Sequence, residues 1–248
     1  MNLLNLIKKN LRVMALGFVV VLAQGCATGP HAHPADPLEP LNRAVFNFND
    51  GLDRTILQPV ANAYEQVTPS PIRTGVRNFF GNISDVWSVA NNLLQFKLTE
   101  SVETLMRVGV NTTLGFGGVL DIATEARLAK NKQSFGQTLG VWGVNAGPYV
   151  VLPLFGPSSV RDTIGMVIDS KADLIGSTHH VPTRNSLTVL RGVGRRADLL
   201  YASDIFDQAA LDRYTFARDL YLHRRASSIG KDAAVPEERF DLPEPPAK

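Results

Sequence analysis

The sequence predicts a mainly α-helical protein, and three observations favour this class. Apolar residues recur three and four positions apart along most of the chain, which is the spacing of one helix face. Residues that commonly begin helices precede several of these apolar stripes. Glycine and proline are concentrated in one stretch of about forty residues, so regular helix is interrupted mainly there.

The first 25 residues are typical of a bacterial lipoprotein signal peptide. A basic region is followed by an apolar run over 13–23, which is too short to span a bilayer, and Cys26 comes directly after the small residue Gly25. We therefore expect residues 1–25 to be removed and Cys26 to be acylated. Leu22 lies one place earlier than the leucine usual at such sites, and the alternative is a free thiol beside an ordinary cleavage site.

The mature chain is nearly neutral. Removal of the signal takes away three of the 25 basic residues and none of the 23 acidic ones, which leaves 22 basic against 23 acidic side chains. This balance gives no support for binding to nucleic acid. A lone cysteine also excludes an internal disulfide.

Beyond the signal, we expect one helical domain between two unstructured ends. Residues 26–35 form a flexible tether, 36–230 a single domain, and 231–248 a disordered acidic, proline-rich tail with too few apolar residues to pack. Ala27 stands where aspartate retains many enteric lipoproteins in the inner membrane. The sequence therefore predicts a lipid-anchored protein on the periplasmic side of the cell outer membrane.

The first predicted helix begins near Asp36. This residue precedes Pro37 and stands three positions before Glu39, a pattern that predicts a capping box. An apolar stripe follows at Leu41, Val45, Phe48 and Leu52.

A second helix is predicted to begin at Ser70 and to end at Gly81 and Asn82, because glycine is common where helices stop. Asp85 and Thr99 then open two further segments. Apolar residues cover much of the circumference of both, so these helices are either deeply buried or in contact with lipid.

A glycine-rich segment separates these helices from the C-terminal ones. Its glycines permit bends and close backbone approach, and Gly115–Gly118 is interpreted as a hinge or packing site. Tyr149–Phe155 has the composition of a short strand, although Pro153 argues against a central one.

Three helical segments are predicted in the C-terminal part. Ser158 or Ser159 begins one, Thr183 begins another, and a long amphipathic segment covers Ile205–Ser228. Their many arginines have two interpretations. They contact phosphate headgroups or an acidic partner, or they form a solvated face that pairs locally with aspartates. The local aspartates are Asp198, Asp212 and Asp219.

The sequence contains no recognisable catalytic or cofactor-binding motif. It has no G-x-S-x-G, no H-E-x-x-H, no P-loop and no paired cysteine ligands. His31 and His33 lie in the tether, and the adjacent His179 and His180 would face different directions, so solvated histidines are expected rather than metal ligands. We expect no enzymatic activity, cofactor or metal.

Several longer motifs stand in a characteristic order. They are DPLEPLNRAVFNFND at 36–50, NFFGN at 78–82, NTTLGFGGVLDIA at 111–123 and FGQTLGVWGVNAGPYVVLPLFGPSSVRDTIG at 135–165. Over about 130 residues, from Asp36 to Asp169, the chain resembles the MlaA family of outer-membrane lipoproteins, also called VacJ. Beyond Asp169 the resemblance fades.

This resemblance implies a ring-like bundle of amphipathic helices that lies in one leaflet of the outer membrane beside a trimeric porin. It implies removal of mislocalised phospholipids from the outer leaflet through an amphipathic channel, with transfer to a soluble periplasmic carrier. A polar conduit would lower the cost of moving a headgroup, while apolar walls would contact the acyl chains. Polar interruptions that fit this role are Asn47, Asn49, Asn91, Asn92 and Gln95.

The resemblance also suggests which residues shape the channel. Core packing is the alternative role of each aromatic candidate. The candidates for lipid contact are Asn47, Phe48, Asn49, Leu114, Phe116, Tyr149 and Phe155. The glycines expected at hinges or in a flexible hairpin are Gly115, Gly117, Gly118, Gly140, Gly143, Gly147 and Gly156.

Two other functions compete with lipid transport. One is a scaffold lipoprotein that binds an outer-membrane porin without moving lipid. The other is a membrane-bound lipid hydrolase, which the missing nucleophile and base argue against.

Overall fold

A computed structural model of the chain describes residues 33–230, which are mostly helical as predicted. The predicted signal peptide, Cys26, His31 and the acidic tail lie outside the described residues. The helical elements are α2 (Glu39–Leu52), the π-helix η1 (Asp53–Leu57), α3 (Gln58–Val67), α4 (Ser70–Leu94), α5 (Leu98–Thr113), α6 (Ile122–Glu125), α7 (Phe135–Val141), α8 (Val160–Ala172), α9 (Val181–Asp198), α10 (Leu200–Ala209) and α11 (Arg213–Ser228). The strands are β1 (Tyr149–Leu152) and β2 (Gly156–Ser159).

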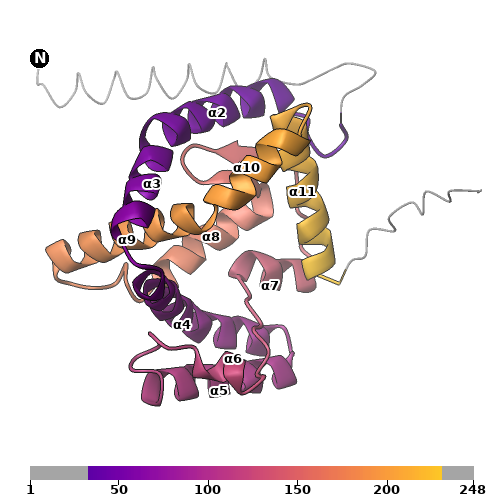
Figure 1. Ribbon diagram of the computed structural model, residues 1–248. Coiled ribbons are helices and arrows are strands. Elements are labelled where there is room, and N and C mark those ends of the chain that lie inside the picture. Colours follow the sequence, from indigo (N-terminus) through magenta and orange to yellow (C-terminus); the bar gives the residue numbers. More distant parts are fainter. Residues whose placement is uncertain (1–32, 231–248) are drawn as a thin grey trace, which may run out of the picture.

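The elements follow one another around a ring (Figure 1). α2 continues through η1 into α3, which packs against α9, and α9 contacts α4. α4 contacts α7, α7 packs on α8, and α8 contacts β2. β1 pairs with β2 and returns to α2, so the circuit closes. α5 lies outside this circuit against α4, and α6 packs on α5. The predicted ring-like helical architecture is confirmed.

The glycine-rich segment contains a two-stranded antiparallel hairpin. Tyr149 lies opposite Ser159, and Leu152 lies opposite Gly156. Pro153 comes just after the last paired residue of β1, where its missing N–H group costs no ladder hydrogen bond. Gly156 has a φ of 79°, a left-handed conformation that suits glycine and lets the turn close tightly. The predicted strand therefore exists but ends before the proline.

The predicted capping role of Asp36 is wrong. α2 begins at Glu39, and no side chain caps its first turn. Asp36 is instead fully buried, where its carboxylate accepts a hydrogen bond of 2.8 Å from Asn42 Nδ2. It also accepts a hydrogen bond from the Tyr214 hydroxyl. A tertiary contact to the far end of the chain therefore replaces the local cap.

The predicted break at Gly81 and Asn82 is also wrong, because α4 runs without interruption for 25 residues. A glycine inside a helix costs only about 1 kcal/mol, and tertiary packing outweighs that cost here. Gly81 and Asn82 are both buried, and Asn82 Nδ2 donates to Thr112 Oγ1 on α5 at 2.9 Å. The predicted start at Ser70 is confirmed, and the helix expected from Thr99 begins one residue earlier, at Leu98.

The C-terminal helices follow the prediction with one exception. Ser159 caps α8 by accepting a hydrogen bond from the Asp162 backbone N–H, and α9 begins at Val181, two residues before the predicted start. The long segment predicted over Ile205–Ser228 is instead two helices, α10 and α11. Asp212 begins the second one by capping its first turn.

Candidate functional site

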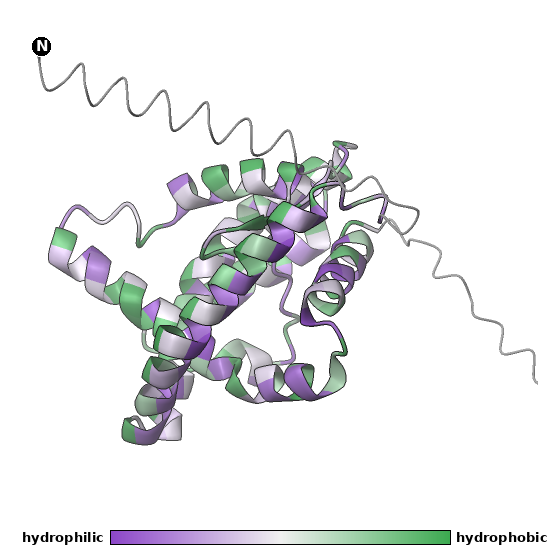
Figure 2. Ribbon diagram, turned by 90° about the horizontal axis from the view of Figure 1, so that it is seen from above, coloured by the Kyte–Doolittle hydropathy of each residue, from purple (hydrophilic) through white to green (hydrophobic). Residues whose placement is uncertain are grey.

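α4 and α5 turn their polar side chains inward and their apolar side chains outward. Asn91 and Asn92 are completely buried and Thr104 nearly so, whereas Phe96 is 86% exposed and Leu98 63%. Helices that face water have the opposite polarity, so the outer face of this pair suits hydrocarbon. Figure 2 shows hydrophobic and hydrophilic positions alternating along the helices, as expected for amphipathic elements. The other exposed large apolar residues of the pair are Ile72, Val86, Leu93, Leu94, Val102, Leu105 and Met106.

Hydrogen bonds hold the buried face of this pair together. Ser101 Oγ donates to the Val89 carbonyl at 3.1 Å, which joins α5 to α4. Gln95 Nε2 donates to Thr138 Oγ1 of α7 at 3.0 Å, and that hydroxyl donates in turn to Asn91 Oδ1 at 2.7 Å. Because buried polar groups are costly without partners, this network fixes how α4, α5 and α7 meet.

A buried arginine organises the loop that follows α5. Arg107 is almost fully buried, and its guanidinium donates to Asp121 at 2.9 Å and to the Leu128 carbonyl at 2.6 Å. Asn111 also donates to Asp121, at 3.0 Å. Burial alone would raise the pKa of Asp121, but hydrogen bonds from Thr124 and Asn111 and the charge of Arg107 lower it. The loop from Leu114 to Leu120 is therefore tied to α5 at both of its ends.

A second polar centre closes the ring. Asn42 of α2 bridges Asp36 and the hairpin, donating to the Tyr149 carbonyl at 3.0 Å and accepting from the Val151 N–H at 2.8 Å. Tyr214 of α11 completes the centre by donating to Asp36. Burial, together with that hydrogen bond and charge, raises the pKa of Tyr214 well above its ordinary value. The two ends of the domain are thus joined through one buried carboxylate.

A cavity of about 510 Å³ opens between β2, α7, α10 and α11. Apolar residues such as Phe206 and Leu220 line it together with Tyr221 and Arg225. Arg225 and the Tyr221 hydroxyl both bind the buried Asp162, the former at 2.8 Å. The cavity therefore has one apolar side and one polar, positively charged side.

The structure separates the predicted lipid-contact residues into two groups. Phe48 and Phe155 are exposed near the hairpin, where Asn49 fastens α2 to the turn through 2.9 Å and 2.8 Å hydrogen bonds with the Leu152 carbonyl and the Leu154 N–H. The exposed Asn47 lies on the same helix as Phe48. The other group is Leu114 and Phe116, both exposed in the loop between α5 and α6.

Tyr149 does not fit the prediction of lipid contact. Its exposed fraction is 0%, and it packs with Val151 and Tyr214 in a hydrophobic core. A fully enclosed side chain has no surface to offer a lipid, so core packing, the alternative role, describes this residue.

The predicted hinge and hairpin glycines lie in three places, and two of them show why glycine is needed. Gly118 has a φ of 91°, and a Cβ atom there would come within 2.5 Å of the Asn82 side chain. A Cβ atom on Gly140 of α7 would come within 2.7 Å of Ile229. Close packing therefore accounts for both positions. Gly115 and Gly117 share the loop of Gly118, Gly143 and Gly147 follow α7, and Gly156 begins β2.

Most arginines of α9 and α11 form ion pairs with acids from other elements, rather than with local aspartates. Arg218 does pair with Asp219, at 2.8 Å. Asp198 and Asp212 pair instead with residues far away in sequence, Arg77 at 3.2 Å and Arg43 at 2.7 Å. The longer-range pairs of the C-terminal arginines are Arg191 with Asp173, Arg196 with Asp53, Arg213 with Asp50, Arg218 with Asp36 and Arg225 with Asp162.

Sequence reasoning noted Asn91, Asn92 and Gln95 as polar interruptions, but it missed that polar stripes run along both α4 and α5, although their signal is present. Polar residues recur there at helical spacing, in the same way as the apolar residues that predicted these helices. The buried stripes are Asp85, Ser88, Asn92 and Gln95 on α4, and Ser101, Thr104, Arg107 and Asn111 on α5. A polar stripe within a widely apolar helix would have indicated which face turns inward.

Residues 33–230 contain no group of three histidine, cysteine, aspartate or glutamate side chains arranged to hold a metal ion. Within the same range, no helix is long and apolar enough to cross a membrane.

Comparison with known proteins assigns the chain to a family. The MlaA lipoprotein family model matches residues 34–228, nearly the whole described part. The chain belongs to the MlaA family. The intermembrane phospholipid transport system lipoprotein MlaA of Escherichia coli strain K12 is 36% identical over 234 residues, which is 92% of each chain, and the protein of the same description from Shigella flexneri matches equally well.

A solved MlaA-like structure supports the same assignment. It was described under the heading "Structural basis for maintenance of bacterial outer membrane lipid asymmetry". Its TM-score to this chain is 0.69 at 34% identity, and the match covers 78% of this chain and 98% of the other. The inward polarity and ring closure described above are therefore features of an MlaA-family fold.

Proposed function

We propose that this MlaA-family chain is an outer-membrane lipoprotein that removes mislocalised phospholipids from the outer leaflet and passes them to a soluble periplasmic carrier. Its relatives are described as lipoproteins of an intermembrane phospholipid transport system. The observation that carries the proposal is the inverted polarity of α4 and α5 within a closed ring. Such a ring offers apolar surface to the bilayer and polar surface within the protein.

Two features of the ring lower the costs of lipid transfer. A headgroup that leaves water needs polar partners, and the cavity between β2, α7, α10 and α11 offers them through Tyr221 and Arg225. Acyl chains lose about 0.8 kcal/mol for each methylene that becomes exposed to water, so they need a continuous apolar path. The outer faces of α4 and α5 provide such a surface. The protein's part is passive binding and orientation, without a chemical step on the lipid.

The proposal includes the placement of the protein. Acylated Cys26 would anchor the ring to the inner leaflet of the outer membrane, with a trimeric porin beside it. The exposed apolar loop residues Leu114 and Phe116 and the exposed Phe155 give the ring additional apolar contact area.

Outer-leaflet phospholipid labelling in a deletion strain tests the function. The strain is complemented with the wild-type chain or with Cys26→Ala. We expect raised surface phospholipid in the deletion strain and restoration by the wild type alone. Unchanged surface phospholipid in the deletion strain would argue for the scaffold function, in which the protein binds a porin without moving lipid.

A further inference from the structure

A second cavity, of about 240 Å³, lies between α4 and α9 and is strongly basic. Six cationic side chains line it, and Asp198 is the acid among its lining residues. The six are Arg73, Arg77, Lys130, Lys132, Arg191 and Arg195. Three of them form ion pairs, Arg73 with Glu65, Arg77 with Asp198 and Arg191 with Asp173.

The other three cations, Lys130, Lys132 and Arg195, form no ion pair within residues 33–230. The buried Asp85 of α4 lies close enough to feel the charges of the two lysines, but it forms no ion pair with either of them in the described residues. The Tyr64 hydroxyl at the wall of the cavity also lacks a hydrogen-bond partner. The cavity thus holds an excess of positive charge and a spare donor.

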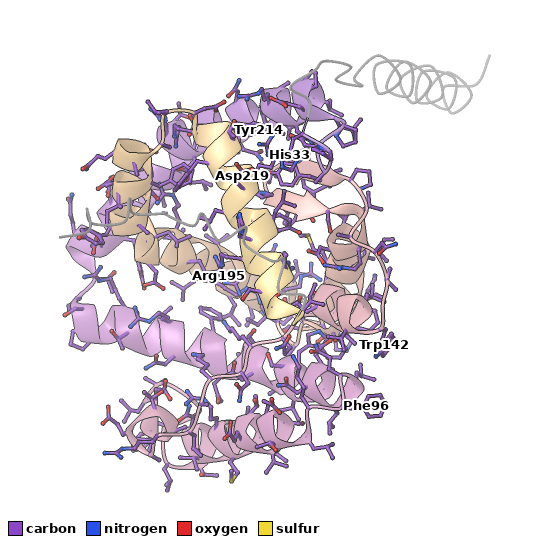
Figure 3. All side chains as sticks on the ribbon, turned by 90° about the vertical axis from the view of Figure 1, so that its right-hand side faces the viewer. His33, Phe96, Trp142, Arg195, Tyr214 and Asp219 are labelled. Carbon is purple, nitrogen blue, oxygen red and sulfur yellow. The ribbon has the colours of Figure 1, made fainter. Side chains whose placement is uncertain are left out.

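Lys132 and Arg195 line the basic cavity, and both side chains remain exposed to water. Burial nevertheless lowers the pKa of each, because surrounding protein replaces much of the solvent around the charge. In Figure 3 the side chain of Arg195, a residue of α9, is labelled near the middle of the view. An anion that enters this cavity would meet several cations at once, and their attractions would add.

An apolar groove of about 420 Å³ adjoins the basic cavity. The two share Val76 and Phe80 of α4 in their walls. The groove is lined almost wholly by apolar side chains, including Phe79 of α4, Val119 of the loop before α6, and Leu190 of α9. A single seam between α4 and α9 therefore presents concentrated positive charge beside a hydrocarbon-like surface.

We infer that the α4–α9 seam binds one anionic amphiphile, with its phosphate in the basic cavity and an acyl chain in the apolar groove. The inference rests on the proposed function and locates a phospholipid on this chain. Lys132 and Arg195 supply charge-assisted hydrogen bonds to the phosphate oxygens. The shared wall of Val76 and Phe80 places the apolar groove within reach of a chain attached to that phosphate.

Photocrosslinking on the full-length chain in phosphatidylcholine vesicles tests this assignment. The probe is phosphatidylglycerol with a diazirine on one acyl chain, and mass spectrometry maps the labelled peptides. We expect labelling of α4 near Val76 and of α9 near Leu190. In the double variant Lys132→Gln/Arg195→Gln, labelling at these peptides should fall about tenfold, the loss expected when charge-assisted hydrogen bonds are removed.

A matched variant controls for total charge. Lys171→Gln/Arg184→Gln removes one lysine and one arginine that form no ion pair in the described residues and lie outside both cavities. We expect its seam labelling to equal that of the wild type, and thermal melting to match in all three proteins. Equal labelling in the Lys132/Arg195 variant would overturn the inference, because the groove would then contact lipid without regard to charge.

Two further probes identify the source of the phosphate. A diazirine diacylglycerol, which has no phosphate, should label the seam about tenfold less than the phospholipid. Displacement of the phospholipid by inorganic phosphate at matched concentration would overturn the assignment in favour of a free-phosphate site. Labelling only at the cavity beside α11 would overturn the seam but leave the proposed function intact. No labelling anywhere would count against both.

Discussion

The α4–α5 pair and the hairpin region are built for different surroundings. Between α4 and α5, polar groups such as Asn92 and Thr104 are buried and Leu98 and Leu105 face outward. Around the hairpin, Tyr149, Val151 and Tyr214 form a conventional hydrophobic core. Across residues 33–230, nineteen buried residues are polar or charged and nine are hydrophobic, so the inverted pattern dominates the ring. One chain therefore combines a hydrophobic core typical of water-soluble proteins with an apolar outer face typical of proteins that contact a membrane.

Removal of Arg107 should lower the stability of the protein most, because it disrupts the buried polar network beside α5. Arg107→Ala leaves the Asp121 carboxylate without its guanidinium partner, which lies 2.9 Å away. We expect the free energy of unfolding in detergent to fall by about 3–5 kcal/mol. Denaturant unfolding followed by circular dichroism measures it, and Arg127→Ala, an exposed arginine, is the control. A loss below about 1 kcal/mol would mean that the buried network is not needed for stability.

Polar substitutions on the outer face of α5 should weaken binding to membranes, whereas the same change elsewhere should not. Val102→Asn/Leu105→Asn places two amides on the outer face of α5, and we test it in a Cys26→Ala background so that no lipid anchor contributes. We expect binding to vesicles to weaken by about 2 kcal/mol, roughly thirtyfold. Vesicle flotation reports the change, and Lys171→Asn on α8 is the control. Unaltered flotation would place the outer face of α5 in water.

In the hydrophobic core around the hairpin, loss of the Tyr214 hydroxyl should lower stability by a moderate amount. Tyr214→Phe keeps the aromatic packing of the hairpin core but removes the hydrogen bond to the buried Asp36. We expect a loss of about 1–3 kcal/mol in unfolding free energy, because a buried acceptor loses a partner. Tyr201→Phe, an exposed tyrosine, is the control for the chemical change. Equal stabilities of the two variants would contradict the role given to Asp36 in closing the ring.

A smaller, pH-dependent effect on stability is expected from Asp85, a buried carboxylate of α4. Burial raises the pKa of Asp85 above its ordinary value of 3.8, so its carboxylate destabilises the fold at neutral pH. Asp85→Asn should therefore stabilise the protein by about 1 kcal/mol at pH 7. The gain should vanish below about pH 4, where the acid is protonated in both the folded and the unfolded chain. Thermal melts across this range would contradict the assignment if the gain grew toward low pH.

Local sequence patterns predicted most helices but not the contacts between distant parts. Apolar stripes located α4, α5, α8 and α9, since helical spacing is a local property. Asp36 has the local pattern of a helix cap, yet its partner Tyr214 lies 178 residues away. Gly81 likewise has the local pattern of a helix end, and only the packing of α4 explains why the helix continues.

Lipid contact stays a prediction for the exposed Phe48, Phe116 and Phe155, whereas Tyr149 belongs to the hydrophobic core. The basic cavity joins Lys132 to Arg195, residues from two separate elements. The hydrophobic periodicity of either segment does not indicate that these two residues line the same cavity.

The hydrogen bond between Asp36 and Tyr214 joins residues 178 positions apart, which has a consequence for folding. The chain is made from its N-terminus, so the partner that completes the ring is among the last residues to emerge. Contacts between such distant residues form slowly, because a long loop must close first. Until α11 arrives, helices can form but the ring stays open, with Phe96 and Leu98 already exposed. The growing chain therefore needs its apolar outer surface covered before its own architecture is complete.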